Sequence, residues 1–181
     1  MRSNLHLQVD QLNIGVLINK NLLLYIIYII MSNSFKFANQ IIPNLWLGNR
    51  NSPKETDNLI KNNIKLIINC SKDLVYESDV NIQVIRLSIN DINSVESNQI
   101  LGDQIEYLTY LINIYLNNNY GVLIHCYAGV QRSATVVLCY LLKYKHMSLD
   151  MGKAIMKQNR SIVFFPYPTF DSFINNYSMI V

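Results

Sequence analysis

Residues 121–135 read GVLIHCYAGVQRSAT, and this stretch changes character twice. Its first part is apolar over 122–124, which is typical of a buried strand. A short loop opened by Cys126 follows, in which Ala128 and Gly129 allow a tight backbone approach. An apolar helix is expected to begin near Arg132. The stretch therefore predicts a strand, a tight loop and a helix in direct succession.

The chemistry of this loop favours an anion. Unpaired N–H groups at a helix start bind negative charge, and tightly turned loop amides add to this. Arg132 can donate two parallel hydrogen bonds to the oxygens of a phosphate. Cys126, near that cation and the helix start, is expected to react as a thiolate. The loop thus predicts a nucleophile beneath a phosphate cradle.

The rest of the chain alternates between strand and helix patterns. Strands are expected at 41–42, 45–48, 65–69, 82–87 and 122–124, and helices at 53–61, 97–117, 133–145, from Ser148 onward, and 168–176. Such alternation predicts an α/β fold with a mainly parallel central sheet covered by helices on both faces.

Two local features of these helices can be predicted from residue type. Ser52, Pro53 and Glu55 resemble an N-cap, first-turn proline and capping-box glutamate. In the helix after Ser148, we expect Met151, Ala154 and Ile155 to face inward.

Composition limits the class of protein. The chain has 181 residues, of which 50% are hydrophobic and 15% charged, so it is long and apolar enough for one globular domain. Its net charge of +3 comes with no basic run, which argues against a nucleic-acid partner. Three cysteines, Cys70, Cys126 and Cys139, fit a reducing compartment, and a cytoplasmic location is expected. The three histidines show no ligand spacing with the cysteines, so neither a metal nor a cofactor is expected.

The first 31 residues differ from the rest. Residues 22–31 form an unbroken apolar run of ten, well short of the roughly 20 that a membrane-spanning helix needs. No small-residue cleavage site follows it. We interpret 1–31 as an extension that is dispensable or lies upstream of the true start at Met31, with a membrane or signal segment and a packed accessory segment as alternatives. Residues 32–181 are then the catalytic domain, and a membrane partner is not favoured.

Residues 125–135 closely resemble the signature of cysteine-dependent dual specificity protein phosphatases. The resemblance extends over about 38–178, and the short length and late cysteine suggest a compact member, such as those of large DNA viruses. It implies a phosphatase that acts on phosphotyrosine and phosphoserine or phosphothreonine in proteins through a phospho-cysteine intermediate.

The chemistry of the residues assigns roles that agree with this resemblance. Cys126 would attack phosphorus, and Arg132 with the backbone of the loop would hold the phosphate oxygens. Ser133 would bond the departing thiolate, and His125 would orient the loop and tune the thiol. The substrate-binding residues would be the members of the loop, namely Tyr127, Ala128, Gly129, Val130, Gln131 and Arg132.

The leaving group needs a proton, so a general acid is expected as well. Asp91 follows the 82–87 strand and precedes the long helix, where the family places its acid. Asp79 and Asp103 are rivals, although Asp103 falls inside the predicted helix.

Cys70 ends a predicted strand. It could be an inert buried residue, but some relatives place a second cysteine here that captures an oxidised nucleophile, so a redox partnership with Cys126 is a second interpretation. Cys139, inside an apolar helix, is expected to be inert.

The chain departs from its relatives at two places. Gln131 stands where they often have Ser or Asn, and Arg160-Ser161 followed by Pro166-Tyr167-Pro168 replaces their usual Arg-Pro and Pro-Asn, which leaves the support of the loop on this side open.

Alternative functions remain. A phospho-binding pseudophosphatase would keep the phosphate cradle but lack a working nucleophile or general acid. The absence of lysine within 127–131 disfavours phosphoinositides, and Ala128-Gly129 disfavours an RNA 5′-phosphatase. A rhodanese-like sulfur transferase fits the Arg132-Ser133 frame poorly.

Overall fold

A five-stranded sheet forms the centre of the computed structural model, which describes residues 37–74 and 81–181. The strands are β1 (Ala38–Ile42), β2 (Leu45–Gly48), β3 (Ile64–Asn69), β4 (Gln83–Arg86) and β5 (Gly121–His125). They lie in the order β1-β2-β5-β3-β4, and only the β1–β2 pair is antiparallel. The predicted mainly parallel sheet is confirmed.

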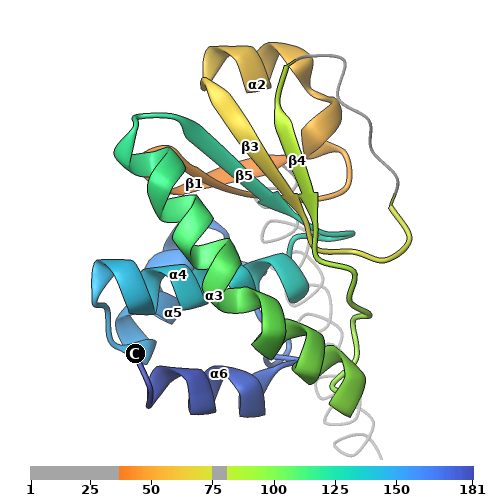
Figure 1. The fold of residues 1–181 in the computed structure, drawn as a ribbon, viewed down its shortest axis with the longest axis vertical. Coiled ribbons are helices and arrows are strands. Elements are labelled where there is room, and N and C mark those ends of the chain that lie inside the picture. The colour runs from red at the N-terminus through yellow and green to blue at the C-terminus, as the bar shows by residue number, and fades with distance from the viewer. Residues whose placement is uncertain (1–36, 75–80) are drawn as a thin grey trace, which may run out of the picture. The chain divides into compact units, whose positions relative to one another are not determined.

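Helices cover both faces of this sheet (Figure 1). The described helices are a 3-10 turn (Ser52–Lys54), α2 (Thr56–Lys61), α3 (Val95–Asn117), α4 (Arg132–Lys145), α5 (Leu149–Asn159) and α6 (Asp171–Ser178). Helix α2 packs on β3 over a small cluster that includes Leu59, Ile67 and Leu123. The larger core lies on the other face, where α4 is buried between the sheet and helices α3, α5 and α6.

The parallel strands direct their ends to one edge. The arrowheads of β3, β4 and β5 meet near the start of α4 (Figure 1). Residues that follow these strands therefore come together, as is general for sites in open α/β sheets.

Two local predictions were wrong. Ser52 does not cap α2: its hydroxyl donates to the Asn49 carbonyl at 2.6 Å, and a 3-10 turn precedes the helix. On α5, Ile155 is partly buried against the core as predicted, but Met151 and Ala154 are exposed, while Gly152 and Met156 are the buried residues. The reason is close packing on α4, since a Cβ at Gly152 would lie 2.7 Å from Leu138.

One end of the molecule also differs from expectation. Helix α6 begins at Asp171, and the residues before it, predicted to be helical from 168, form an irregular segment instead. The predicted extension 1–31 and the rival acid Asp79 lie outside the described residues.

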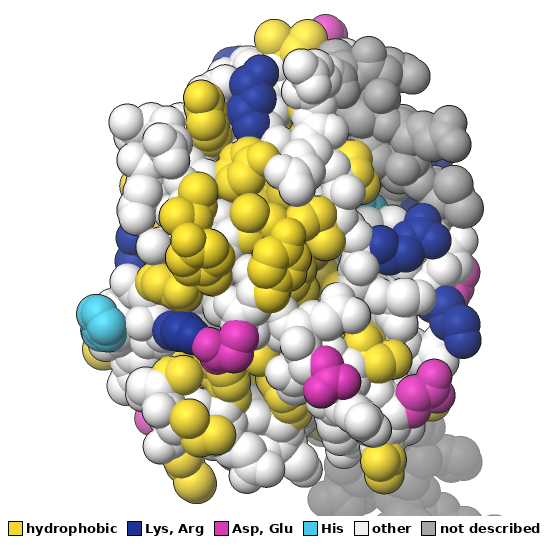
Figure 2. Space-filling model, viewed as in Figure 1, with side chains coloured by type: hydrophobic (Ala, Val, Ile, Leu, Met, Phe, Trp, Pro, Cys, Tyr) yellow, Lys and Arg dark blue, Asp and Glu magenta, His cyan; other side chains and the backbone are white. Residues whose placement is uncertain are grey.

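The outer face of α3 is rich in exposed hydrophobic side chains. Figure 2 shows such side chains gathered over the C-terminal half of α3, where Tyr107, Tyr110 and Ile114 are exposed. Within 37–74 and 81–181, no helix combines the length and apolar character that crossing a membrane requires.

Candidate active site

The nucleophile position is set by the fully buried strand β5. Cys126 follows its last residue and is 1% exposed, and the loop that it opens runs to Arg132, the first residue of α4. We call residues 126–132 the phosphate loop. Beside it, β2 pairs in parallel with β5, which puts Gly48 next to His125. The predicted succession of strand, tight loop and helix is confirmed.

The sulfur of Cys126 accepts two hydrogen bonds. The backbone N–H of Gly129 donates to Sγ at 3.2 Å, and the hydroxyl of Ser133 donates to it at 3.2 Å. Both donors stabilise a sulfur that carries negative charge, because a hydrogen bond to an ionised acceptor is stronger than one to a neutral acceptor. Ser133 thus lies where the sequence predicted.

Four successive carbonyls of the phosphate loop are held from outside. The Tyr127 carbonyl accepts from the backbone of Arg50 at 3.1 Å, and that of Val130 accepts from the backbone of Phe164 at 2.9 Å. The Ala128 and Gly129 carbonyls each accept from the Arg160 side chain at 2.9 Å. Because C=O and N–H point oppositely across a trans peptide, the N–H groups that follow these carbonyls point away from the outside partners, and that of Gly129 reaches the Cys126 sulfur. The loop therefore presents inward-facing donors, as an anion site requires.

Arg160 supports the phosphate loop, a role that the sequence left open. Arg160 is 1% exposed, and besides the two loop carbonyls its guanidinium donates to Oδ1 of Asn39 at 2.7 Å. Burial lowers its pKa to about 10, so it stays charged at neutral pH. The sequence signals were its place at the end of a predicted helix and its match to the arginine of the relatives' Arg-Pro pair; no local pattern showed that it turns back to the loop.

Gly129 has a conformational reason to be glycine. Its φ is +69°, and a Cβ there would lie 2.5 Å from the carbonyl oxygen of Gly48. Any side chain would therefore push the loop away from β2.

Asp91 approaches the phosphate loop from the segment after β4. Its Oδ2 lies 3.3 Å from Nε of Arg132, and the Asp91 side chain is 38% exposed whereas that of Arg132 is 7% exposed. This contact is an ion pair without hydrogen-bond alignment, since Nε has no aligned acceptor among the described residues. NH1 of Arg132 reaches the Ile89 carbonyl at 3.5 Å. The buried guanidinium thus retains donor capacity for an anion.

The environment of Asp91 suits a proton donor. Burial raises the pKa of its carboxyl, and the positive charge of Arg132 opposes that shift. The rival Asp103 is exposed on α3. Among the described aspartates, Asp91 is the one that forms an ion pair with Arg132.

His125 is buried beneath the loop. Burial lowers its pKa to about 4, against a smaller opposing effect of the Cys126 backbone, so the imidazole is neutral at pH 7. Neither ring nitrogen makes a well-formed hydrogen bond to a described residue. A neutral ring lends Cys126 no positive charge.

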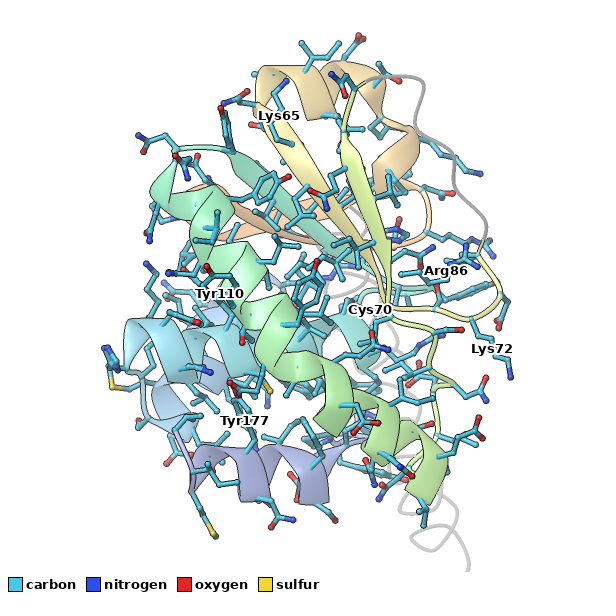
Figure 3. The ribbon with its side chains drawn as sticks, viewed as in Figure 1. Lys65, Cys70, Lys72, Arg86, Tyr110 and Tyr177 are labelled. Atoms are coloured by element: carbon cyan, nitrogen blue, oxygen red, sulfur yellow. The ribbon has the colours of Figure 1, made fainter. Side chains whose placement is uncertain are left out.

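Cys70 lies one strand away from Cys126. It directly follows β3 (Figure 3), and its backbone N–H donates to the His125 carbonyl at 2.8 Å. Asn69 and His125 are paired in the sheet, so Cys70 and Cys126 occupy the next positions on neighbouring strands. Burial raises the pKa of the Cys70 thiol, and Cys126 raises it further. Cys139, buried in α4, also has a raised pKa because of burial.

Gln131 is turned away from the cradle. Its Nε2 donates to the carbonyls of Phe165 at 3.1 Å and Tyr167 at 3.0 Å, and its Oε1 accepts from the backbone of Thr169 at 2.9 Å. Only its backbone remains part of the phosphate loop. Tyr127, in contrast, is 50% exposed, with the Arg50 guanidinium 4.3 Å from its ring centre.

No group of three or more potential metal-ligating side chains (His, Cys, Asp, Glu) occurs in the part of the chain that the structure describes.

Comparison with known proteins identifies similar sequences. Residues 45–178 match the family model of the dual specificity phosphatase catalytic domain. Human dual specificity protein phosphatase 9 is 33% identical over 127 residues, which cover 69% of this chain and 32% of that protein. Protein 123R of Invertebrate iridescent virus 6, provisionally named a tyrosine phosphatase, is 32% identical over 125 residues, which cover 69% of this chain and 81% of that protein.

A solved structure agrees in fold. Human DUSP28 superposes with a TM-score of 0.73 at 19% identity, covering 80% of this chain and 94% of that one. The chain spans about a third of the length of the human relative but most of the viral one. The family model and these relatives together show that the chain belongs to the dual specificity phosphatase family.

Proposed function

We propose that this chain is a cysteine-dependent protein phosphatase that hydrolyses phosphotyrosine and phosphoserine or phosphothreonine through a phospho-cysteine intermediate. The observation that carries the proposal is the convergence of a doubly hydrogen-bonded Cys126 sulfur, a buried Arg132 and the carboxyl of Asp91 on one loop. Family membership supports the same reaction class.

In the first step the Cys126 thiolate attacks phosphorus. An S–P bond forms, the P–O bond to the substrate breaks, and the leaving oxygen takes the proton of the Asp91 carboxyl. Arg132 and the inward N–H groups of the phosphate loop hold the oxygens on which charge develops.

In the second step water attacks the phospho-cysteine. Asp91, now a carboxylate, removes a proton from the water, a P–O bond forms, and the S–P bond breaks. The hydroxyl of Ser133, 3.2 Å from Sγ, donates to the departing thiolate. Inorganic phosphate leaves, and the enzyme returns to its starting state.

Substrate binding would itself prepare the acid. Without substrate, Arg132 lowers the pKa of Asp91 and works against burial. A bound phosphate shares the charge of Arg132 and adds negative charge near the carboxyl, and both changes raise the pKa of Asp91. Asp91 would thus be protonated at the point in the reaction where it must donate its proton.

The deciding experiment is turnover by the purified full chain. We expect release of phosphate from a phosphotyrosine peptide and from a phosphothreonine peptide of the same sequence. Tight binding of both peptides without release would instead indicate a pseudophosphatase.

The Asp91→Asn protein is expected to lose about 10²- to 10⁴-fold in kcat/KM on a phosphothreonine peptide, whose alkoxide needs the proton most. Because burial raises the pKa of Asp91, its protonated form persists to higher pH than that of an ordinary aspartate. The alkaline limb of the wild-type pH–rate profile is therefore expected to disappear in Asp91→Asn. Asp103→Asn, on the exposed face of α3, is the control; a full rate in Asp91→Asn would remove Asp91 as the acid.

We also propose that Cys70 protects Cys126 from peroxide. Adjacent parallel strands lie about 4.8 Å apart, within the Cα separation that a disulfide requires. Peroxide would oxidise the Cys126 thiolate to a sulfenic acid; the Cys70 sulfur would then form the S–S bond, with loss of the S–OH oxygen as water. A thiol reductant would restore both cysteines.

The test compares recovery after peroxide. Wild-type activity is expected to return on addition of dithiothreitol, whereas Cys70→Ser is expected to lose most of its activity permanently as Cys126 passes to the sulfinic acid. Cys139→Ser is the matched control. Equal, irreversible loss in wild type and Cys70→Ser would contradict the partnership.

The proposed setting is a reducing compartment, and we propose the cytoplasm. All three cysteines are free, and Cys126 must be reduced to act. Phosphorylated proteins are the proposed partners.

A further inference from the structure

The segment between α5 and α6 is fastened directly to the phosphate loop. We call residues 164–169 the strap. Four hydrogen bonds join it to Val130 and Gln131: the Phe164 N–H to the Val130 carbonyl at 2.9 Å, and the three made by the Gln131 side chain. Gln131 is 8% exposed and uses both its amide nitrogen and its amide oxygen here. The strap therefore has a fixed place beside the cradle.

The strap presents two aromatic side chains to solvent. Phe165 is 72% exposed and Tyr167 is 73% exposed. The backbone carbonyls of both residues accept from the Gln131 side chain, so their backbone lies beside the phosphate loop while their side chains are exposed. Aromatic side chains with a polar tip, such as that of Tyr167, are enriched at binding interfaces.

A third exposed aromatic residue belongs to the loop itself. Tyr127 directly follows Cys126, and Arg50 fixes it twice, through its carbonyl and through the contact of the guanidinium with its ring. We call Tyr127, Phe165 and Tyr167 the aromatic rim. Its members come from two segments that both attach to the phosphate loop.

We propose that the aromatic rim makes this site favour phosphotyrosine over phosphoserine and phosphothreonine. The inference rests on the proposed function and narrows its substrate class. A phosphotyrosine whose phosphate lies in the cradle would have its ring just outside the loop, where the rim side chains could reach it. Phosphoserine and phosphothreonine have only a short aliphatic side chain at this place. They would offer no ring for the aromatic rim to contact.

The physical gain is stacking and burial of one aromatic ring. Aromatic pairs are stabilised beyond the area that they bury, and several weak contacts of this kind together give about a ten-fold preference. Gln131 acts as a positioning residue, because it touches the strap and not the substrate ring.

The test measures binding, in a Cys126→Ser background where no turnover occurs. Peptides of one sequence that carry phosphotyrosine or phosphothreonine are titrated by calorimetry, and the ratio of the two Kd values is the readout. Since no bond to the leaving group breaks, the greater chemical reactivity of aryl esters does not enter. Turnover by the wild type is a separate measurement, so a failure of the proposed function is recognised independently.

Phe165→Ser with Tyr167→Ser is expected to weaken phosphotyrosine binding about ten-fold and to leave phosphothreonine binding nearly unchanged. Gln131→Leu, similar in size but without the amide, is expected to shift the ratio in the same direction. The control is Tyr107→Ser with Tyr110→Ser, an exposed aromatic pair on α3, which should leave the ratio unchanged. Equal weakening of both peptides by the rim substitutions, or an unchanged ratio, would overturn the proposal.

Discussion

Replacement of Arg132 by lysine is expected to lower kcat/KM on a phosphotyrosine peptide about a thousand-fold. Lysine keeps the positive charge but loses the planar pair of donors that binds two phosphate oxygens at once. It also loses the 3.3 Å ion-pair geometry between Nε and Asp91. The fall in kcat/KM therefore has two causes: the transition state is held less well, and Asp91 loses its contact with Arg132.

The matched control for this substitution is Arg86→Lys. Arg86 is exposed on the edge strand β4 (Figure 3), and its guanidinium contacts the Leu74 carbonyl rather than the phosphate loop. The kcat/KM of the Arg86→Lys protein should equal that of the wild type. If Arg132→Lys retained a rate within a few-fold of the wild type, Arg132 would not be the residue that binds the transferring phosphoryl group.

Replacement of Cys126 by serine is expected to abolish turnover, with a fall of roughly 10⁴- to 10⁶-fold in kcat. Serine is close in size and keeps the neighbours that hydrogen-bond the sulfur, Gly129 and Ser133. Its hydroxyl, however, is not ionised at neutral pH and is a poor leaving group in the second step. Phosphopeptide binding should survive, because the cradle and Arg132 are intact.

The cysteine control is Cys139→Ser, in the buried core of α4. It should retain turnover even if the protein unfolds at a lower temperature. Circular dichroism of Cys126→Ser should match the wild type. Residual turnover in Cys126→Ser near the wild-type rate would require a different nucleophile.

The fold was predictable wherever a strand or helix carries its own pattern. The apolar run 122–124, the helical spacing from Leu101 to Tyr115 and the Pro43-Asn44 turn all correspond to observed elements. Errors occurred where a tertiary contact overrides local preference. Met151 was predicted to face inward from periodicity, but the approach of α5 to α4 at Gly152 rotates the buried face.

The centre of the site was more predictable than its surroundings. Cys126, Arg132 and Ser133 share one loop, so their spacing alone indicates chemistry. Asp91 could be assigned only by its place after a strand, and the structure now puts it beside Arg132.

Arg160 and Gln131 show what sequence alone could not provide. Arg160 lies about thirty residues from the carbonyls that it holds, at separations of 31 and 32 along the chain. Gln131 reaches 34 to 38 residues ahead, to a strap that local preference assigned partly to a helix. Contacts at such distances depend on how α4 and α5 pack, and no local pattern encodes them.

The central claim is that Cys126 carries the phosphoryl group during turnover. The direct measurement uses the Asp91→Asn protein, because hydrolysis of its phospho-cysteine should be slow. The protein is mixed with p-nitrophenyl phosphate and quenched in acid, and phosphoryl groups are then located by peptide mass mapping. We expect one phosphoryl group on the peptide that contains Cys126. We expect none in a protein that carries both Asp91→Asn and Cys126→Ser. Release of p-nitrophenol with no phosphoryl group on Cys126 would contradict the mechanism.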